Sequence, residues 1–347
     1  MLKWIIIGFI ILFVLACFGV AFMVQWQTFK SSQIDPDTAL GNYDYYADRY
    51  PRREVSFLSG KNRLKGYVYG EDNKKALLVF CHGIWSGPEE YLMMLTWFVD
   101  QGYQVFTYSN TSYNGSQGKW AKGLFQSPLD LNAALNYIES QETFQGLPIL
   151  LLGHSWGGFA VTSGLSFHPE VEGVAALSGF NQPLEMSDSV ARKMFGRISI
   201  LFTLPSHVIN WILFPKYMGL TAVKGINHTQ APVLLVHGTN DDFIYYNETS
   251  ILSKKDQITN PGLCTITLDD GKYAAHNTYF LSKESEDYLE SCDAAWKEMA
   301  KGLKKDEIRS KKHDFYQTVD LDRSNQPNVE LFTKIRNFYE EKCLGEN

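Results

Sequence analysis

The stretch that decides the fold of this chain is Ile149-Leu150-Leu151-Leu152-Gly153-His154-Ser155-Trp156-Gly157-Gly158. Its opening apolar run follows Pro148 and is too short for a helix, so it predicts a fully buried strand. The run ends in Gly-x-Ser-x-Gly, and residues 159–167 continue as a predicted helix. A serine between a strand and a helix sits in a strained turn, and glycines beside it avoid collisions with the neighbouring strand. The stretch therefore predicts a nucleophile elbow centred on Ser155.

The rest of the chain predicts a sheet covered by helices. Residues 54–58 and 64–69 alternate in polarity about a Gly60-Lys61-Asn62 turn and indicate a hairpin. Beyond the hairpin, buried strands alternate with helices, one of which is predicted to begin at Ser127 as its cap, with Pro128 and Asp130 in its first turn. This order predicts the α/β class, with a mostly parallel sheet and helices on both faces. The later predicted strands are 76–81, 104–108, 149–153, 173–178, 233–237 and 263–268.

Composition narrows the possible partners. The 347 residues are 45% hydrophobic and 20% charged, which is ordinary for a globular protein with a large core. The net charge of −6 argues against nucleic acid as a partner. The 5 cysteines show neither zinc-ligand spacing nor a Cys-x-x-Cys pair, and their odd, scattered arrangement argues against a disulfide framework.

The N-terminal region predicts a membrane anchor. Trp4 to Trp26 contains no charged residue and, as a helix, would span about 34 Å, enough to cross a bilayer core. We expect a short flank at 1–3, a transmembrane anchor at 4–26, a polar tether at 27–52 and one large domain at 53–347. Lys3 and the amino terminus, set against Lys30, Asp35 and Asp37, favour a single-pass protein with the domain outside the cytoplasm.

Two alternatives to the anchor stay open. The small residues Gly19-Val20-Ala21 could form a signal-peptide cleavage site, which would give a secreted protein, although the apolar run is long for a signal peptide. Val14-Leu15-Ala16-Cys17 resembles a lipoprotein box, but the apolar run continues beyond Cys17. The length of the run favours the uncleaved anchor.

An insertion interrupts the strand–helix alternation at about residues 180–230. Its segment 195–218 is strongly apolar and aromatic, but Pro205, His207 and Asn210 interrupt it, so a second membrane span is not favoured. We interpret the insertion as a helical cap that lines an apolar substrate pocket. The alternative is a cap that only buries its apolar face on the main domain.

A serine nucleophile needs a base, and the base needs an orienting acid. In this strand–turn–helix context the chain order is serine, acid, histidine. His276 follows the last predicted strand and is favoured over His313, which lies in the charged stretch 311–314. For the acid, Asp241 and Asp242 compete just past the strand 233–237, with Asp269 and Asp270 as more distant possibilities.

Acyl transfer also needs hydrogen-bond donors for the oxyanion. One is the backbone N–H of Trp156, the residue after the nucleophile. The other is expected in the loop 82–87, where Ile84 is the best candidate. His82 and His237 each precede a glycine at a strand end, and we interpret them as structural rather than catalytic.

These motifs together resemble the α/β-hydrolase fold over residues 53–300, and most closely the bacterial serine aminopeptidase/monoacylglycerol-lipase-like group with an inserted cap. The resemblance implies an eight-stranded sheet and no cofactor. It also implies Asp241 as the acid, because the family's acid lies four residues after the histidine of His-Gly-x-x-Asp. Relatives often carry Asp after the strand 104–108, where this chain has Ser109-Asn110-Thr111. The matching motifs are His82-Gly83, Gly102–Val105, Gly115–Gly118, Gly153–Gly158, His237–Asp241 and His276.

The sequence thus predicts a membrane-anchored serine hydrolase that cleaves a small, apolar carboxylic ester with Ser155, His276 and Asp241. One alternative keeps the same triad but removes N-terminal residues from a short peptide, using acidic cap residues such as Glu185 and Asp188 to bind the amine. A third reading is a non-catalytic surface binding module on the same scaffold. The oligomeric state is not specified by the sequence.

Overall fold

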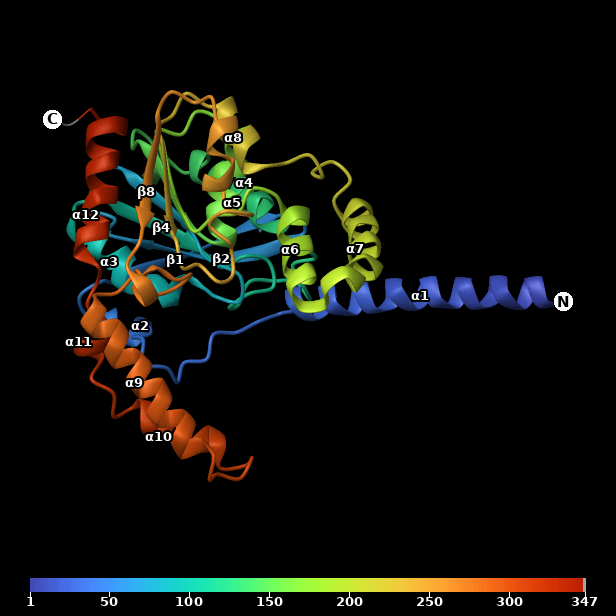
Figure 1. Cartoon of the computed structure of the whole chain (residues 1–347). Helices are drawn as coiled ribbons and strands as arrows, with labels where there is room; N and C mark the ends of the chain where they lie inside the picture. Colours follow the sequence, from blue (N-terminus) through green and yellow to red (C-terminus); the bar gives the residue numbers. More distant parts are fainter. Residues whose placement is uncertain (346–347) are drawn as a thin grey trace.

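The computed structural model describes residues 1–345, with an eight-stranded sheet at its centre (Figure 1). The strand order is β1-β2-β4-β3-β5-β6-β7-β8; β2 is antiparallel to both β1 and β4, and the remaining pairs are parallel. The predicted hairpin and the mostly parallel sheet are confirmed. The strands are β1 Arg52–Ser59, β2 Asn62–Tyr69, β3 Leu77–Cys81, β4 Gln104–Tyr108, β5 Ile149–His154, β6 Gly173–Leu177, β7 Val233–Gly238 and β8 Leu263–Leu268.

Helices cover both faces of this sheet because successive strand side chains point to opposite sides. On β3, Leu77 and Val79 face one core, which α4, α5 and α8 complete, whereas Leu78 and Phe80 face the other, which α3 and α12 complete. The strands are therefore buried on both faces, which explains their continuous apolar runs. These helices are α3 Leu92–Asp100, α4 Gln126–Glu139, α5 Trp156–Ser163, α8 Ala222–His228 and α12 Val329–Phe338.

The predicted start of α4 is wrong. The helix begins at Gln126, so Ser127 lies inside it and caps nothing. Asp130 is fully buried and accepts hydrogen bonds from Ser59 Oγ (2.6 Å), from the Thr111 N–H (2.7 Å) and from Gln126 Nε2 (2.9 Å). This carboxylate therefore ties the hairpin and the loop after β4 to the helix instead of compensating the helix dipole.

The insertion contains two helices, α6 (Pro183–Phe195) and α7 (Ile200–Leu213), which we call the cap. Pro205 lies inside α7 without ending it. The third helix of the region, α8, packs against α5 and belongs to the main body. Figure 1 shows the cap on the side of the molecule where α1 leaves it, with α7 beside α1.

The N-terminal helix α1 runs from Leu2 to Phe29, and in the described chain it is the one helix long and apolar enough to cross a membrane. Its buried residues Ala21, Gln25 and Phe29 are spaced four apart and therefore share one face. The last turns of α1 thus pack on the domain, while the earlier turns extend away from it (Figure 1).

The segment after α1 is docked on the body. It contains the short helix α2 (Tyr43–Tyr46), and the Tyr45 hydroxyl donates to Asp322 at 2.5 Å. Asp35 pairs with Lys312, and Asp37 pairs with His313 at 2.8 Å. These partners belong to a C-terminal helical extension that projects from the body in Figure 1, formed by α9 Lys283–Ala300, α10 Ile308–Tyr316 and α11 Leu321–Ser324.

Candidate active site

The predicted strand–turn–helix around Ser155 is present. Strand β5 ends at His154, helix α5 begins at Trp156, and Ser155 between them has the strained dihedral φ of 57°. A Cβ atom added at Gly157 would lie 1.9 Å from the carbonyl oxygen of Cys81, and one at Gly153 would lie 2.3 Å from that of Gly157. Both positions therefore admit only glycine, which explains the two glycines that frame the motif.

The structure brings Ser155, His276 and Asp241 together in one hydrogen-bonded row. The Ser155 Oγ lies 2.9 Å from His276 Nε2, and His276 Nδ1 lies 2.8 Å from Asp241 Oδ2. The carboxylate can only accept, so His276 Nδ1–H donates to it and Nε2 is left to accept the serine proton. Asp241 follows β7 and His276 follows β8, so both come from loops at the carboxyl ends of parallel strands. This geometry can activate a serine for attack.

Asp241 is held as a buried carboxylate. Its Oδ1 accepts the backbone N–H groups of Phe243 (3.0 Å) and Ile244 (2.7 Å), and its Oδ2 lies 3.1 Å from His237 Nε2. Burial raises the pKa of Asp241, but the hydrogen bonds from His237 and His276 outweigh it and hold the pKa well below the usual range. His237, interpreted from the sequence as structural, thus contacts the acid that orients His276.

The other candidate acids and the other candidate base, His313, lie away from this row of residues. Asp242 is exposed, although it is the next residue in the chain. Asp269 accepts a hydrogen bond from Thr239 Oγ1 (2.9 Å), and Asp270 pairs with Lys283 (2.5 Å). His313 is exposed on α10, where it pairs with Asp37. Among the acids proposed from the sequence, Asp241 is the one that meets His276.

The two residues predicted as oxyanion donors lie in segments beside the serine. Trp156 is the first residue of α5, and the first amides of a helix have no partner within the helix. A Cβ atom added at Gly83 would lie 3.5 Å from the Cβ of Ser155, so the loop that carries Ile84 runs directly beside the nucleophile. Ile84 itself is half-buried in the apolar cluster that contains the Trp156 ring.

A chain of hydrogen bonds that the sequence did not reveal connects this loop to His276. The Gly83 N–H donates to the Tyr91 hydroxyl (3.3 Å), and His154 Nε2 lies 3.0 Å from the His276 carbonyl oxygen. A carbonyl only accepts, so His154 carries its proton on Nε2, and Tyr91 donates to His154 Nδ1 at 2.8 Å. Burial lowers the pKa of His154 well below its usual range, which keeps the ring neutral. Neither Tyr91 nor the variable position 154 of the motif signals such a role in the sequence.

The surroundings of the triad are apolar, and the end of α1 forms part of them. The ring of Phe29 lies 6.1 Å from that of Trp156, and the Trp85 Nε1–H donates to the Thr28 carbonyl at 2.8 Å. The ring of Phe243 lies 5.2 Å from that of His276. Ser155 itself is only 2% exposed.

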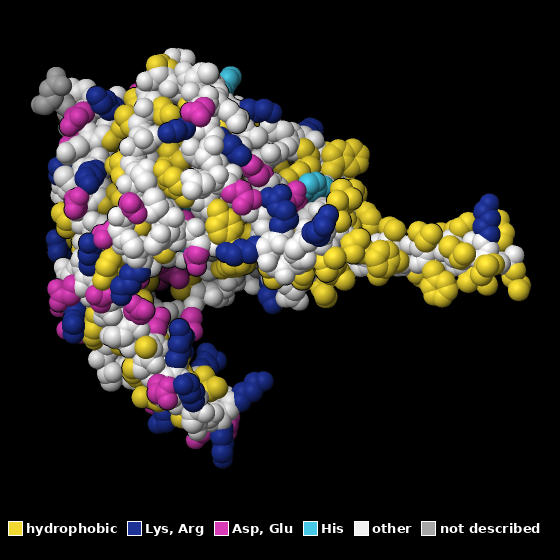
Figure 2. Space-filling model, viewed as in Figure 1, with side chains coloured by type: hydrophobic (Ala, Val, Ile, Leu, Met, Phe, Trp, Pro, Cys, Tyr) yellow, Lys and Arg dark blue, Asp and Glu magenta, His cyan; other side chains and the backbone are white. Residues whose placement is uncertain are grey.

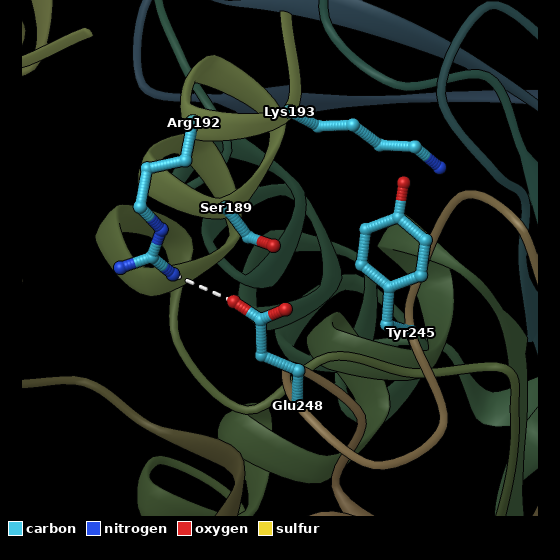
Figure 3. Close-up of a pocket in the computed structure, with 5 residues that line it drawn as sticks. All are labelled: Ser189, Arg192, Lys193, Tyr245 and Glu248. Atoms are coloured by element: carbon cyan, nitrogen blue, oxygen red, sulfur yellow. Dashed lines mark hydrogen bonds and ion pairs between the residues drawn. The ribbon is translucent and has the colours of Figure 1, made fainter. Parts of the chain in front are cut away.

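A separate surface pocket lies where α6 meets the loop after β7 (Figure 3). Figure 3 shows the ion pair between Arg192 and Glu248 (2.6 Å), with the Lys193 amine 4.3 Å from the centre of the Tyr245 ring. The pocket is charged and its described lining does not include the triad; its residues are Ser189, Arg192, Lys193, Tyr245 and Glu248. The Arg192–Glu248 ion pair at this pocket links α6 to the loop after β7.

The acids that an aminopeptidase would need in the cap already have partners. Glu185 pairs with Lys254 at 2.5 Å, and Asp188 lies 2.9 Å from His207 Nε2. A free substrate amine would have to displace these side chains.

One group of side chains has the ligand atoms for a metal ion. Glu139, His168 and Glu170 offer atoms within 4.8 Å of one another. Both carboxylates are exposed, and His168 already bonds to Glu170 (2.8 Å) and to Asn132 (3.1 Å), so we assign no metal to this group.

Comparisons with known proteins agree with this fold. The family model described as serine aminopeptidase, S33, matches residues 72–217. The Bacillus subtilis (strain 168) protein YqkD is 25% identical over 204 residues, which cover 55% of this chain and 64% of that relative, so the match spans less than two thirds of its length. The structure of the Pyrococcus furiosus esterase Pf2001 superposes with a TM-score of 0.57 and 16% identity, covering 89% of this chain and all of that one. The Butyrivibrio proteoclasticus protein Est1E gives a TM-score of 0.50 at 17% identity, covering 71% of this chain and 97% of that one.

Proposed function

We propose that this chain, which has the α/β-hydrolase fold, is a serine hydrolase that cleaves a carboxylic ester through an acyl-enzyme. The observation that carries this proposal is the hydrogen-bonded row Ser155–His276–Asp241, with distances of 2.9 Å and 2.8 Å. Each of these distances lies within the range that proton transfer to a positioned base requires.

In the proposed mechanism Ser155 Oγ attacks the acyl carbon while its proton passes to His276 Nε2. Asp241 stabilises the imidazolium that forms, and the N–H groups of Trp156 and Ile84 hold the oxyanion. The C–O bond to the alcohol then breaks, and His276 returns the proton to the leaving oxygen. Water attacks the acyl-enzyme, His276 takes the proton from that water, and the acid leaves as Ser155 Oγ is reprotonated.

An ester is favoured over a peptide because of the cap. The aminopeptidase alternative needs free carboxylates for the substrate amine, but Glu185 and Asp188 are both engaged with basic side chains. The Trp156 ring, next to the nucleophile in the chain, instead lies in an apolar cluster that includes Phe29, Phe159 and Phe180. These surroundings support an acyl or aryl group as the part of the substrate that is recognised.

We also propose that residues 4–26 remain as a membrane anchor with the domain outside the cytoplasm. Ala21, Gln25 and Phe29 are buried against the domain, so signal-peptide cleavage after Ala21 would cut within turns that the fold uses. Mass measurement of the membrane-extracted protein tests this proposal. An intact N-terminus supports the anchor, whereas a chain that begins at Phe22, or at a lipidated Cys17, contradicts it.

A substrate panel tests the ester assignment. We expect the purified full chain to hydrolyse p-nitrophenyl esters of varied acyl length faster than aminoacyl anilides, and Ser155→Ala to hydrolyse neither. Faster turnover of anilides would support the peptidase instead. Equal, background-level hydrolysis by wild type and Ser155→Ala would indicate the non-catalytic binding module.

A further inference from the structure

The cap presents an exposed apolar surface, which we call the cap face. On α7 its members recur at helical spacing along one side, while Pro205 and Ile209 are buried on the other. Leu204 is 58% exposed, Trp211 61% and Ile212 64%. Monomeric soluble proteins rarely leave such a contiguous surface uncovered. The cap face consists of Met194, Phe195, Ile198, Ile200, Leu201, Leu204, Val208, Trp211 and Ile212.

The position of α1 relative to the cap suggests what covers this face. Residues 2–20 of α1 have no buried member and span about 28 Å, close to the roughly 30 Å of a bilayer core. Contact with the body begins at Ala21, and one turn later the amides of Gln25 and Asn210 of α7 meet at 3.4 Å. If α1 crosses a bilayer, α7 therefore lies at the level of its surface.

The orientation of the cap fits such a surface. Figure 1 shows α7 crosswise to α1, and an α7 at right angles to a membrane-spanning helix would lie along the plane of the membrane. Figure 2 shows that the hydrophobic side chains of α1 continue onto the adjoining part of the cap. An amphipathic helix in this position matches the geometry of interfacial helices, which place their apolar face among the lipid headgroups.

Three sequence segments around the base of α1 lack acidic residues, although Asp188 of α6 pairs with His207 of α7. Residues 189–240 contain no Asp or Glu, although the whole chain has a net charge of −6. The segments 1–34 and 101–129 also lack acidic residues, and both meet at the base of α1, where Lys30 pairs with Trp120 as a β-bridge. Exposed basic residues in these segments would attract anionic lipid headgroups. They include Lys30, Lys119, Lys122, Lys193, Arg197 and Lys216.

We propose that the cap face docks into the lipid–water interface of the bilayer that α1 crosses. The apolar side chains enter the headgroup region, and the basic residues beside them meet anionic lipids. The docking itself requires only that α1 spans the membrane. One consequence rests on the proposed function. Thr28 and Phe29 of α1 contact Trp85 and Trp156, the residues that follow Ile84 and Ser155 in the chain, so the ester would reach Ser155 from the bilayer, with an acyl chain as its apolar part.

Quenching of Trp211 by brominated lipid tests the docking. The full chain is placed in nanodiscs of phosphatidylcholine and phosphatidylglycerol, with and without bromine on the acyl chains, and wild type is compared with Trp211→Phe. We expect the emission attributable to Trp211 to be lost in brominated discs. Trp97→Phe is the matched control, because Trp97 is half-buried on α3 against Phe332, and its emission should be unaffected by bromine.

Activity gives a second measurement. We expect Leu204→Ser combined with Trp211→Ser to lower the ratio of bilayer-borne to water-soluble ester hydrolysis about tenfold. Leu58→Ser is the control, since Leu58 is also 58% exposed but lies on β1.

Two results would overturn the proposal. One is Trp211 emission that bromine does not change, and the other is a dimer in the nanodiscs that crosslinks through the cap face, which would assign that face to a second copy of the chain. If wild type hydrolyses no ester, the proposed function fails, while the quenching result still decides the docking.

Discussion

Asp241 and Asp242 are adjacent residues in opposite environments. Asp241 is 4% exposed and bonds to His276, whereas Asp242 is exposed. We predict that Asp241→Asn lowers kcat for p-nitrophenyl acetate by about 10⁴-fold, because an amide does not fix the tautomer of the histidine as a carboxylate does. Asp242→Asn, the matched control, should stay within about twofold of wild type. A larger loss in the Asp242 variant would reassign the acid.

His82 is predicted to make the stability depend on pH. Burial lowers its pKa to about 4, despite the hydrogen bond from its Nδ1–H to the Gly83 carbonyl, and its Nε2 accepts the Asn110 N–H (3.0 Å). The folded-state pKa lies below the unfolded value of about 6.5, so this contribution to stability is complete above pH 6.5 and is lost as the pH falls towards 4. We expect a loss of about 3 kcal/mol between pH 7 and pH 4.

Thermal unfolding of the detergent-solubilised chain at several pH values checks this prediction. The His82→Gln variant should be less stable at pH 7 but should show a smaller decrease in Tm towards pH 4. An unchanged pH dependence in this variant would mean that His82 is not the group responsible.

At the scale of elements, the turn between β5 and α5 depends on backbone contact. Because a Cβ atom at Gly157 would overlap the Cys81 carbonyl, we predict that Gly157→Ala displaces α5 and costs at least about 3 kcal/mol of stability. Reaction of Ser155 with a fluorophosphonate should fall with it. In Gly302→Ala the nearest atom would be 4.0 Å away, so both measurements should match wild type. Normal labelling of Gly157→Ala would show that the turn tolerates a side chain.

The last turns of α1 are predicted to stabilise the domain as well as anchor it. Phe29 is 7% exposed and packs against Trp156, so Phe29→Ala should destabilise the domain by about 3 kcal/mol and lower kcat/KM. Phe13→Ala removes an equal volume from a position that is 55% exposed. Thermal unfolding and ester hydrolysis should be unchanged in that control. Equal effects of the two substitutions would contradict a specific role for the end of α1.

Across the whole molecule, the sequence predicts the parts of the fold that depend on local pattern. Fully buried parallel strands leave uninterrupted apolar runs, so β3 to β7 are recognisable from composition. In folds with this kind of nucleophile elbow, the acid and then the histidine follow the serine along the chain. That order selects Asp241 and His276 as candidates.

The features that sequence reasoning missed all depend on contacts between distant residues. Ser127 and Pro128 have the local signature of a helix cap and first turn, but α4 begins at Gln126, two residues before the predicted Pro128. Asp130 instead accepts hydrogen bonds from the distant residues Ser59 and Thr111. The link from Tyr91 through His154 to His276 joins three segments that are far apart in the sequence. Likewise, the apolar sequence of α1 does not indicate that Thr28, in its last turn, accepts a hydrogen bond from Trp85.

The central claim is that Ser155 is an activated nucleophile, and fluorophosphonate labelling of the full chain, followed by mass-spectrometric mapping of the modified peptide, tests it most directly. We predict rapid modification of wild type on Ser155, no modification of Ser155→Ala, and much slower modification of His276→Gln, because the base that accepts the serine proton is missing. Labelling of wild type no faster than Ser155→Ala, or a label mapped to another residue, would contradict the account.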